Sequence, residues 1–208
     1  MSFFTRAEWR LHKEFNKLRL KNKNPTIISS NCNGGFIAHD LGLRFNSPTV
    51  NLFFTAADFI RFASNPEYYL SAEPEEIHSI FDFPVGKIHD VTLYFMHYRT
   101  FAEAREKWLE RSKRVDFDNC FIIMTDKNDC TYENILAFDS LPYKNKVIFT
   151  HRPYPEIASA YYMPGFEDKG EVGILSDFKP GLFRRRWLDG FDYVRFLNGK
   201  GFKKKCQK

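Results

Sequence analysis

Apolar and basic residues alternate with a helical period at the start of the chain. The apolar positions recur three or four residues apart and are Phe4, Ala7, Leu11, Phe15 and Leu18. A neighbouring basic stripe consists of Arg6, Arg10, Lys13, Lys17 and Lys21. Residues 1–24 are therefore predicted to form a basic amphipathic helix. We expect its apolar face to pack on the protein's own core, with contact to a membrane surface or a partner as the alternative.

Beyond residue 25, strand-like and helix-like segments alternate, which is typical of a parallel sheet covered by helices. Strands are predicted near residues 26–30, 49–53, 90–96, 119–124 and 146–150. Helices are predicted near residues 35–42, 55–64, 101–114 and 131–138. Thr55 and Thr100 are typical N-cap residues for two of these helices. The expected fold class is α/β, with a three-layer, mainly parallel, Rossmann-like sheet that has helices on both faces.

Residues 25–198 form the predicted α/β domain, either as one unit or as two lobes with an insertion around residues 65–89. The insertion breaks the alternation with three prolines and an acidic cluster. A further short strand is predicted at residues 171–175 and a helical segment at residues 187–197. A basic tail follows over residues 199–208.

Charge is concentrated at the two ends of the 208-residue chain, whose net charge is +5. Residues 1–23 hold seven Lys or Arg against two Glu, and residues 200–208 hold five Lys and no acid, so the part between them is net acidic. A nucleic-acid-binding domain would carry its bases on one folded face, so we expect no nucleic acid partner. The run Arg184–Arg186 is expected to be a solvated face.

Neither a membrane span nor a metal centre is predicted. No apolar stretch approaches the roughly 20 residues that a membrane helix needs, and the N-terminus lacks the apolar core and cleavage site of a secretion signal. The cysteines show no C-x-x-C or zinc spacing, so we expect free thiols at Cys32, Cys120, Cys130 and Cys206. The expected location is the cytoplasm, with a membrane-peripheral location as the alternative.

Chemically competent residues follow four of the predicted strands. Ligands of open α/β sheets bind outside the carboxyl ends of the strands, so these segments are candidate parts of one site. They are Asn31-Cys32-Asn33-Gly34-Gly35, His97-Tyr98-Arg99, Thr125-Asp126-Lys127 and His151-Arg152.

The Asn31–Gly35 turn is a candidate anion site, because glycines let a ligand approach the backbone and a helix start presents free amides. Cys32 is a candidate nucleophile, with His97 or His151 as its base and the glycine amides as an oxyanion cradle. The structural alternative is a tight turn in which the cysteine is a small buried hydrophobe.

The other candidates have structural alternatives as well. A histidine after an apolar strand is commonly neutral and bonded to a carbonyl group. Arg99 and Arg152 favour a phosphate or carboxylate ligand, and Tyr98 is a candidate ligand contact beside them. Asp126 could orient a histidine or a sugar hydroxyl, but we favour a turn at Asp126–Asp129.

Two segments resemble an uncharacterised bacterial family labelled exopolysaccharide or capsule biosynthesis protein: Ile28-Ser-Ser-Asn-Cys-Asn-Gly-Gly and Leu41-Gly-Leu-Arg-Phe-Asn-Ser-Pro-Thr-Val-Asn-Leu-Phe. Further matching pieces are Tyr68-Tyr69-Leu70, Pro84-Val-Gly-Lys-Ile, His97-Tyr98, Trp108-Leu-Glu-Arg111 with Arg114, Leu141-Pro-Tyr-Lys-Asn-Lys-Val and Phe191-Asp-Tyr-Val, within residues 25–198. The family has a bulky residue, often Trp, at the position of Asn33. The resemblance implies an α/β fold with a parallel sheet and a role in assembling surface glycans.

The function expected from the residues and the resemblance together is a cytoplasmic transferase of glycan biosynthesis. Its donor would be an activated, phosphate-containing molecule, either a coenzyme A thioester or a nucleotide sugar, and its acceptor a sugar or lipid-linked glycan intermediate. The donor phosphates are expected on the Asn31–Gly35 turn with Arg99 or Arg152, and His97 is expected to deprotonate the acceptor hydroxyl. The alternative is a non-catalytic adaptor that binds membrane-bound glycan machinery through the basic N-terminal helix and the lysine tail.

Overall fold

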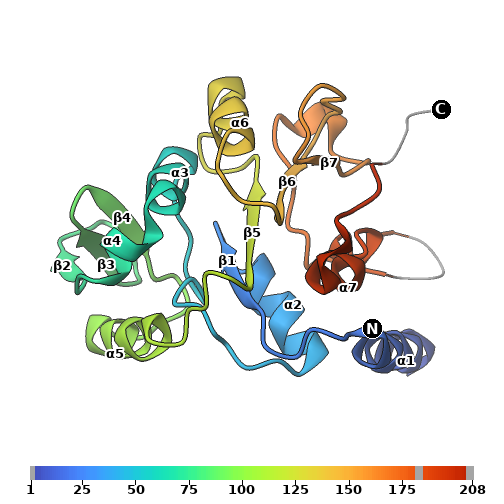
Figure 1. Cartoon of the computed structure of the whole chain (residues 1–208), viewed down its shortest axis with the longest axis horizontal. Coiled ribbons are helices and arrows are strands. Elements are labelled where there is room, and N and C mark those ends of the chain that lie inside the picture. Colours follow the sequence, from blue (N-terminus) through green and yellow to red (C-terminus); the bar gives the residue numbers. More distant parts are fainter. Residues whose placement is uncertain (1–2, 181–184, 205–208) are drawn as a thin grey trace.

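A four-stranded parallel sheet forms the centre of the computed structural model, which describes residues 3–180 and 185–204 (Figure 1). Its strands lie in the order β1 (Thr26–Ser29), β5 (Cys120–Thr125), β6 (Lys146–Thr150) and β7 (Ala160–Tyr162). Each strand pairs in parallel with its neighbour. β1 and β5 are buried along their whole length, as expected for apolar strands that are covered on both faces.

Helices pack on both faces of this sheet. One face is covered by α2 (Asn33–Leu41), η2 (Leu188–Gly190), α7 (Tyr193–Arg195) and η3 (Phe196–Lys200). The other face is covered by α3 (Ala56–Ser64), α5 (Phe101–Ser112) and α6 (Tyr132–Asp139). Ile27 and Ile28 are adjacent in β1 but belong to different hydrophobic clusters, one under each layer. This alternation confirms the predicted α/β class with a mainly parallel sheet.

A second, antiparallel sheet lies beside the first (Figure 1). It consists of β2 (Glu75–Ile77), β3 (Val85–Ile88) and β4 (Val91–Tyr94), and α4 (Pro66–Leu70) precedes it. The prediction that residues 90–96 belong to the parallel sheet is therefore wrong. The chain turns sharply at His89, whose φ is +51°, and this hairpin pairs β4 with β3 instead.

Residues 49–53 do not form a strand. They are an irregular connection with Asn51 at a φ of +66°, and an isolated bridge joins Phe53 to Tyr94. The hydroxyl of Thr49 accepts a hydrogen bond from the Ser29 amide at 2.9 Å. The connection thus contacts the end of β1 through a side chain and adds no strand to the sheet.

Two further predictions about the sheet do not hold. Residues 171–175 form an irregular loop after the short helix η1 (Glu167–Lys169) and contain no strand. The described strands of the parallel sheet cross it in sequence order, from β1 to β7. A Rossmann-like sheet would reverse its order at a switch point, so that part of the prediction is not confirmed.

Threonines are the N-cap residues of three of the helices. Thr55 and Thr100 cap α3 and α5 as predicted, because each hydroxyl accepts from the amide three residues on at 3.2 Å. At α6, Thr131 and Asn134 form a complete capping box. These caps satisfy amides that have no partner within the helix.

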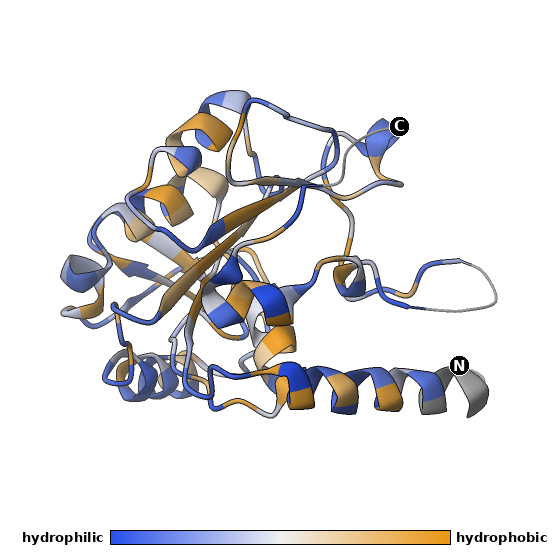
Figure 2. Cartoon of the chain, turned by 45° about the vertical axis from the view of Figure 1, so that its right-hand side comes forward, coloured by the Kyte–Doolittle hydropathy of each residue, from blue (hydrophilic) through white to orange (hydrophobic). Residues whose placement is uncertain are grey.

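α1 (Phe3–Arg19) is present, but the expectation about its packing is wrong. Leu11, Phe15 and Leu18 are 72%, 59% and 85% exposed, and Figure 2 shows hydrophobic bands along the side of α1 that faces away from the rest of the chain. The helix contacts the protein through its opposite side, where Asn16 and Leu20 are buried. None of the helices in the described residues is long and apolar enough to cross a membrane.

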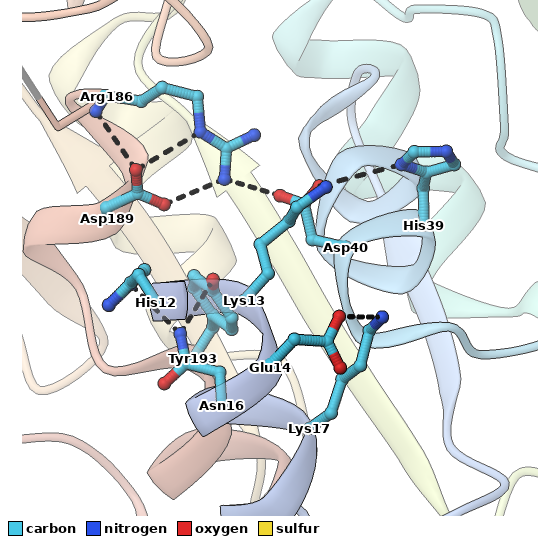
Figure 3. Close-up of polar contacts among 10 residues, drawn as sticks. All are labelled: His12, Lys13, Glu14, Asn16, Lys17, His39, Asp40, Arg186, Asp189 and Tyr193. Atoms are coloured by element: carbon cyan, nitrogen blue, oxygen red, sulfur yellow. Dashed lines mark hydrogen bonds and ion pairs between the residues drawn. The ribbon is translucent and has the colours of Figure 1, made fainter. Parts of the chain in front are cut away.

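The packing of α1 is set by polar groups (Figure 3). Contrary to prediction, Arg186 is buried, and its guanidinium lies 2.5 Å from Asp40 and 2.7 Å from Asp189. Burial alone would lower the pKa of Arg186, but Asp189 and Asp40 outweigh it and raise the pKa above its usual value. Lys13 of α1 lies 4.0 Å from the same Asp40. Arg184 of the basic run lies outside the described residues.

The basic tail contacts the loop before β7 where it is described. Lys204 donates hydrogen bonds to the backbone carbonyls of Pro155 and Ile157. Residues 205–208 of the tail lie outside the described residues.

Candidate functional site

Asp126, His151 and Arg152 meet at the carboxyl edge of the parallel sheet. Asp126 follows β5, and the other two follow the neighbouring strand β6. Asp126 and His151 are buried, whereas Arg152 is exposed. His151 Nδ1 lies 2.6 Å from Asp126 Oδ2, and Arg152 Nε lies 2.9 Å from His151 Nε2. The edge picked from the sequence thus brings three of the candidate residues into one hydrogen-bonded chain.

The Asp126 carboxylate accepts three hydrogen bonds. Besides the ring of His151, Oδ2 accepts from the His151 amide at 2.7 Å, and Oδ1 accepts from the Val172 amide at 2.8 Å. These bonds hold the carboxylate in one orientation. The predicted turn follows, with Asn128 and Asp129 at positive φ. Asp126 therefore both begins a turn and orients a histidine.

The bonding pattern fixes the proton positions on His151. The Nε–H of Arg152 can only donate, so Nε2 of His151 accepts, and the one proton of the neutral ring lies on Nδ1, which donates it to Asp126. A carboxylate that holds Nδ1–H in this way orients the ring as a general base. The basic nitrogen is occupied by Arg152, so His151 can take a proton only after that guanidinium has moved.

The Asn31–Gly35 turn begins α2 at the same edge of the sheet. Two of its amides already have partners: the Asn33 amide donates to Oδ1 of Asn31 at 3.2 Å, and the Gly34 amide donates to Oγ of Ser29 at 3.3 Å. Of the two glycine amides expected to form an oxyanion cradle, that of Gly34 is therefore already bonded within the protein. The binding of an anion by this turn stays a prediction.

Cys32 is half-buried at the N-cap of α2, where its thiol donates to the Leu52 carbonyl at 3.9 Å. Burial raises the pKa of the Cys32 thiol to about 11, so the thiol is protonated at neutral pH despite the helix start. Within the described residues, no histidine forms a hydrogen bond with it. Cys120 and Cys130 are free thiols as well, and Cys206 lies outside the described residues.

His97, Tyr98 and Arg99 follow β4, which belongs to the antiparallel sheet and not to the parallel one. His97 is exposed, and its amide donates to the Asn51 carbonyl at 3.3 Å. Tyr98 is buried, and burial raises the pKa of its hydroxyl. That hydroxyl donates to the Val50 carbonyl at 3.1 Å and accepts from the guanidinium of Arg111 in α5 at 2.8 Å. In this structure Tyr98 therefore links α5 to the connection that contains Val50.

Arg99 lines a cavity of about 780 Å³ beside the small sheet. The cavity wall also contains His78, Asp82 and the ring of Phe81. The residues of the Asp126–Arg152 chain do not line it. The two predicted arginines, Arg99 and Arg152, thus belong to different parts of the molecule.

The loop at Glu171–Val172 is a contributor that the sequence did not reveal. The Val172 amide bonds Asp126, and Lys127 Nζ donates to Glu171 Oε1 at 2.6 Å and to the Val172 carbonyl at 3.0 Å. These contacts join residues more than 40 positions apart, and no local pattern marks them. Within the described part of the chain, no three His, Cys, Asp or Glu side chains are grouped as a metal site.

Comparison with known proteins gives a family without an assigned activity. A family model described as "Domain of unknown function (DUF1919)" matches residues 4–198. The chain is also similar to a protein of Haemophilus influenzae strain Rd that is described as uncharacterised: the two are 46% identical over 180 residues, which cover 86% of this chain and 87% of the relative. Neither description mentions exopolysaccharide biosynthesis, so the glycan role implied by the resemblance has no support from these matches.

Proposed function

Since this chain belongs to the DUF1919 family, whose description states no activity, we propose a function from its geometry. The protein is a transferase in which His151 is the general base and Arg152 binds a phosphate-containing donor. The donor is a coenzyme A thioester or a nucleotide sugar, and the acceptor is a hydroxyl group of a glycan intermediate. The observation that carries the proposal is the hydrogen-bonded chain from Asp126 through His151 to Arg152.

Arg152 couples donor binding to activation of the base. It is exposed, and in the described residues it forms no ion pair and donates to a neutral imidazole nitrogen. A phosphate is a stronger partner for a guanidinium than a neutral nitrogen is. A bound donor phosphate therefore draws Arg152 away from Nε2, so that this nitrogen is free to accept a proton only when the donor is present.

The transfer step uses that freed nitrogen. Nε2 of His151 takes the proton of the acceptor hydroxyl while the hydroxyl oxygen attacks the activated carbon of the donor. The bond from that carbon to the coenzyme A sulfur or to the nucleoside diphosphate oxygen breaks, and the leaving group departs with the bonding electrons. Asp126 stabilises the imidazolium that forms. In this scheme neither Cys32 nor His97 reacts.

The glycan acceptor and the cytoplasmic location are supported by the resemblance and the sequence patterns alone. The rival proposal, a non-catalytic adaptor, is favoured by a different observation, the exposed apolar side of α1. The adaptor needs no ligand at the sheet edge, so ligand binding there separates the two proposals.

A thermal-shift screen with coenzyme A thioesters, nucleotide sugars and pyrophosphate tests the transferase. A ligand at about a hundred times its Kd stabilises the fold by roughly 2.7 kcal/mol, which is readily measured. We expect a stabilising ligand whose effect is lost in Arg152→Gln and kept in Arg99→Gln, the matched control in the cavity beside the small sheet. An effect lost only in Arg99→Gln would assign the donor site to that cavity. If no ligand stabilised the fold, the adaptor would be favoured.

A further inference from the structure

α1 has two opposite sides with different surroundings. Asn16 lies on one side, together with Leu20 directly after the end of the helix, and each is only 3% exposed. Leu11, Phe15 and Leu18 are spaced by four and three residues, so they form a stripe on the other side. That stripe is in water: its least exposed member, Phe15, is 59% exposed. We call these three residues the α1 stripe.

Polar contacts prevent α1 from turning the stripe inward. Asn16 Nδ2 donates to the Tyr193 hydroxyl at 3.1 Å, and Arg19 forms an ion pair with Asp192 at 2.5 Å. A half-turn of the helix would break both contacts and place apolar side chains against the buried carboxylate of Asp40. Figure 3 shows Asn16 bonded to Tyr193, with Asp40 and Arg186 nearby. The stripe is therefore held outward by the rest of the fold.

The stripe is flanked by free cations. Arg10 precedes it and Lys21 follows it, and both side chains are exposed. Within the described residues, neither takes part in an ion pair. Residues 8–23 hold six Lys or Arg against two Glu. An apolar stripe on a strongly basic helix is typical of helices that lie in the plane of an anionic membrane surface.

A second copy of the chain complements this side of α1 less well than an anionic membrane surface does. Antiparallel pairing of two stripes would place Arg10 beside the partner's Lys21, so like charges would meet at both ends. Three side chains also supply only part of the roughly 800 Å² per partner that a standard protein interface buries. Charge complementarity thus favours a negatively charged surface as the partner.

We propose that the α1 stripe binds a membrane surface that contains anionic lipid. Leu11, Phe15 and Leu18 enter the boundary between headgroups and acyl chains, and Arg10 and Lys21 contact lipid phosphates. The helix lies on the surface, with its inner side still attached to the protein. This surface is separate from the sheet edge, so the proposal does not depend on the transferase reaction.

Co-sedimentation of the full chain with vesicles tests the proposal. We expect binding to phosphatidylcholine vesicles that contain phosphatidylglycerol, and far weaker binding to phosphatidylcholine alone. Raising NaCl from about 50 to about 500 mM should weaken the binding, because salt screens the cations. The triple variant Leu11→Ser, Phe15→Ser, Leu18→Ser should bind at least about tenfold more weakly. Its circular dichroism should match wild type, since all three side chains are exposed.

The variant Ile80→Ser is the matched control. Ile80 is apolar and 96% exposed, and it belongs to the loop between β2 and β3, which lies at the other end of the molecule from α1 (Figure 1), so this variant should bind as wild type does. The proposal is overturned if the triple variant binds as well as wild type, or if wild type ignores anionic vesicles at low salt. A wild-type dimer that the triple variant abolishes, without vesicle binding, would assign the stripe to a second copy.

Discussion

Gly34 controls how closely α2 approaches the parallel sheet. A Cβ at this position would lie 2.8 Å from Cβ of Ser29 and 3.0 Å from Cγ2 of Ile27, both in β1. These atoms sit at or near the strand backbone, so they cannot give way as the tip of a long side chain could. Helix–strand packing therefore requires a glycine here, and the hypothesis that this glycine admits a ligand stays a prediction.

We expect Gly34→Ala to lower the free energy of unfolding by about 1–3 kcal/mol, the usual cost of overpacking. Gly35→Ala is the matched control in the same helix turn. Its Cβ would lie 3.4 Å from Cγ1 of Val50, an ordinary contact, and alanine gains up to about 1 kcal/mol of helix propensity. Urea unfolding followed by circular dichroism measures both variants. Equal destabilisation of the two would show that packing on β1 is not the reason for Gly34.

The sequence predicted which residues lie together only where the signal was local. Asp126 and His151 each stand directly after an apolar strand, and parallel pairing of those strands is enough to bring them to one edge. The third bond of Asp126 comes from Val172, in a segment that the sequence predicted as a strand and that is an irregular loop in the structure. Burial of Cys32 and its high thiol pKa likewise depend on chain that packs around it from elsewhere.

At the scale of elements, α1 shows that periodicity finds a helix but not the side that packs. The apolar stripe is the strongest pattern in the segment, yet three charged groups determine which side of α1 packs on the protein. These groups are Asp40 in α2 and Arg186 and Asp189 in the C-terminal part of the chain. No sequence pattern near α1 predicts that they pack against it. The prediction that residues 90–96 join the parallel sheet was wrong for a related reason. The apolar pattern of this segment fits either sheet, and the turn at His89 makes β3 its partner.

Arg186→Met should lower the free energy of unfolding by about 3–5 kcal/mol, because it removes the guanidinium that two buried carboxylates share and leaves Asp40 with only the more distant Lys13, at 4.0 Å. Their side chains, in Asp40 and Asp189, are 3% and 0% exposed. Arg185→Met is the matched control, since Arg185 is the exposed neighbour, and it should change stability by less than about 0.5 kcal/mol. Urea unfolding gives both values. If the two variants proved equally stable, these three charged groups would not be what holds α1 in place.

On the scale of the whole molecule, the small sheet is part of the main core. Val91 and Leu93 of β4 belong to the same hydrophobic cluster as Ile28 and Ile122 of the parallel sheet. The sequence placed an insertion at residues 65–89 but could not show that its strands share a core with distant ones. Shared burial couples the unfolding of the two sheets.

Hydrogen exchange in increasing urea should therefore expose β3–β4 and β5 together. We expect peptides from residues 85–94 and 120–125 to lose protection at the same urea midpoint, because neither sheet keeps its cluster without the other. Mass spectrometry of digested samples resolves the two. Earlier loss of protection in residues 85–94 would mean that the small sheet is a separate, weaker lobe.

Nitrogen-15 NMR of the histidine rings tests whether Asp126 orients His151 as a base that Arg152 blocks until an anion binds, with His151→Gln to assign the signal. We expect a neutral ring with its proton on Nδ1. We also expect an Nε2 signal that shifts when pyrophosphate or the ligand found by thermal shift is added, in wild type but not in Arg152→Gln. A proton on Nε2 in the free protein, or an Nε2 signal that no stabilising phosphate ligand moves, would overturn this role of the three residues.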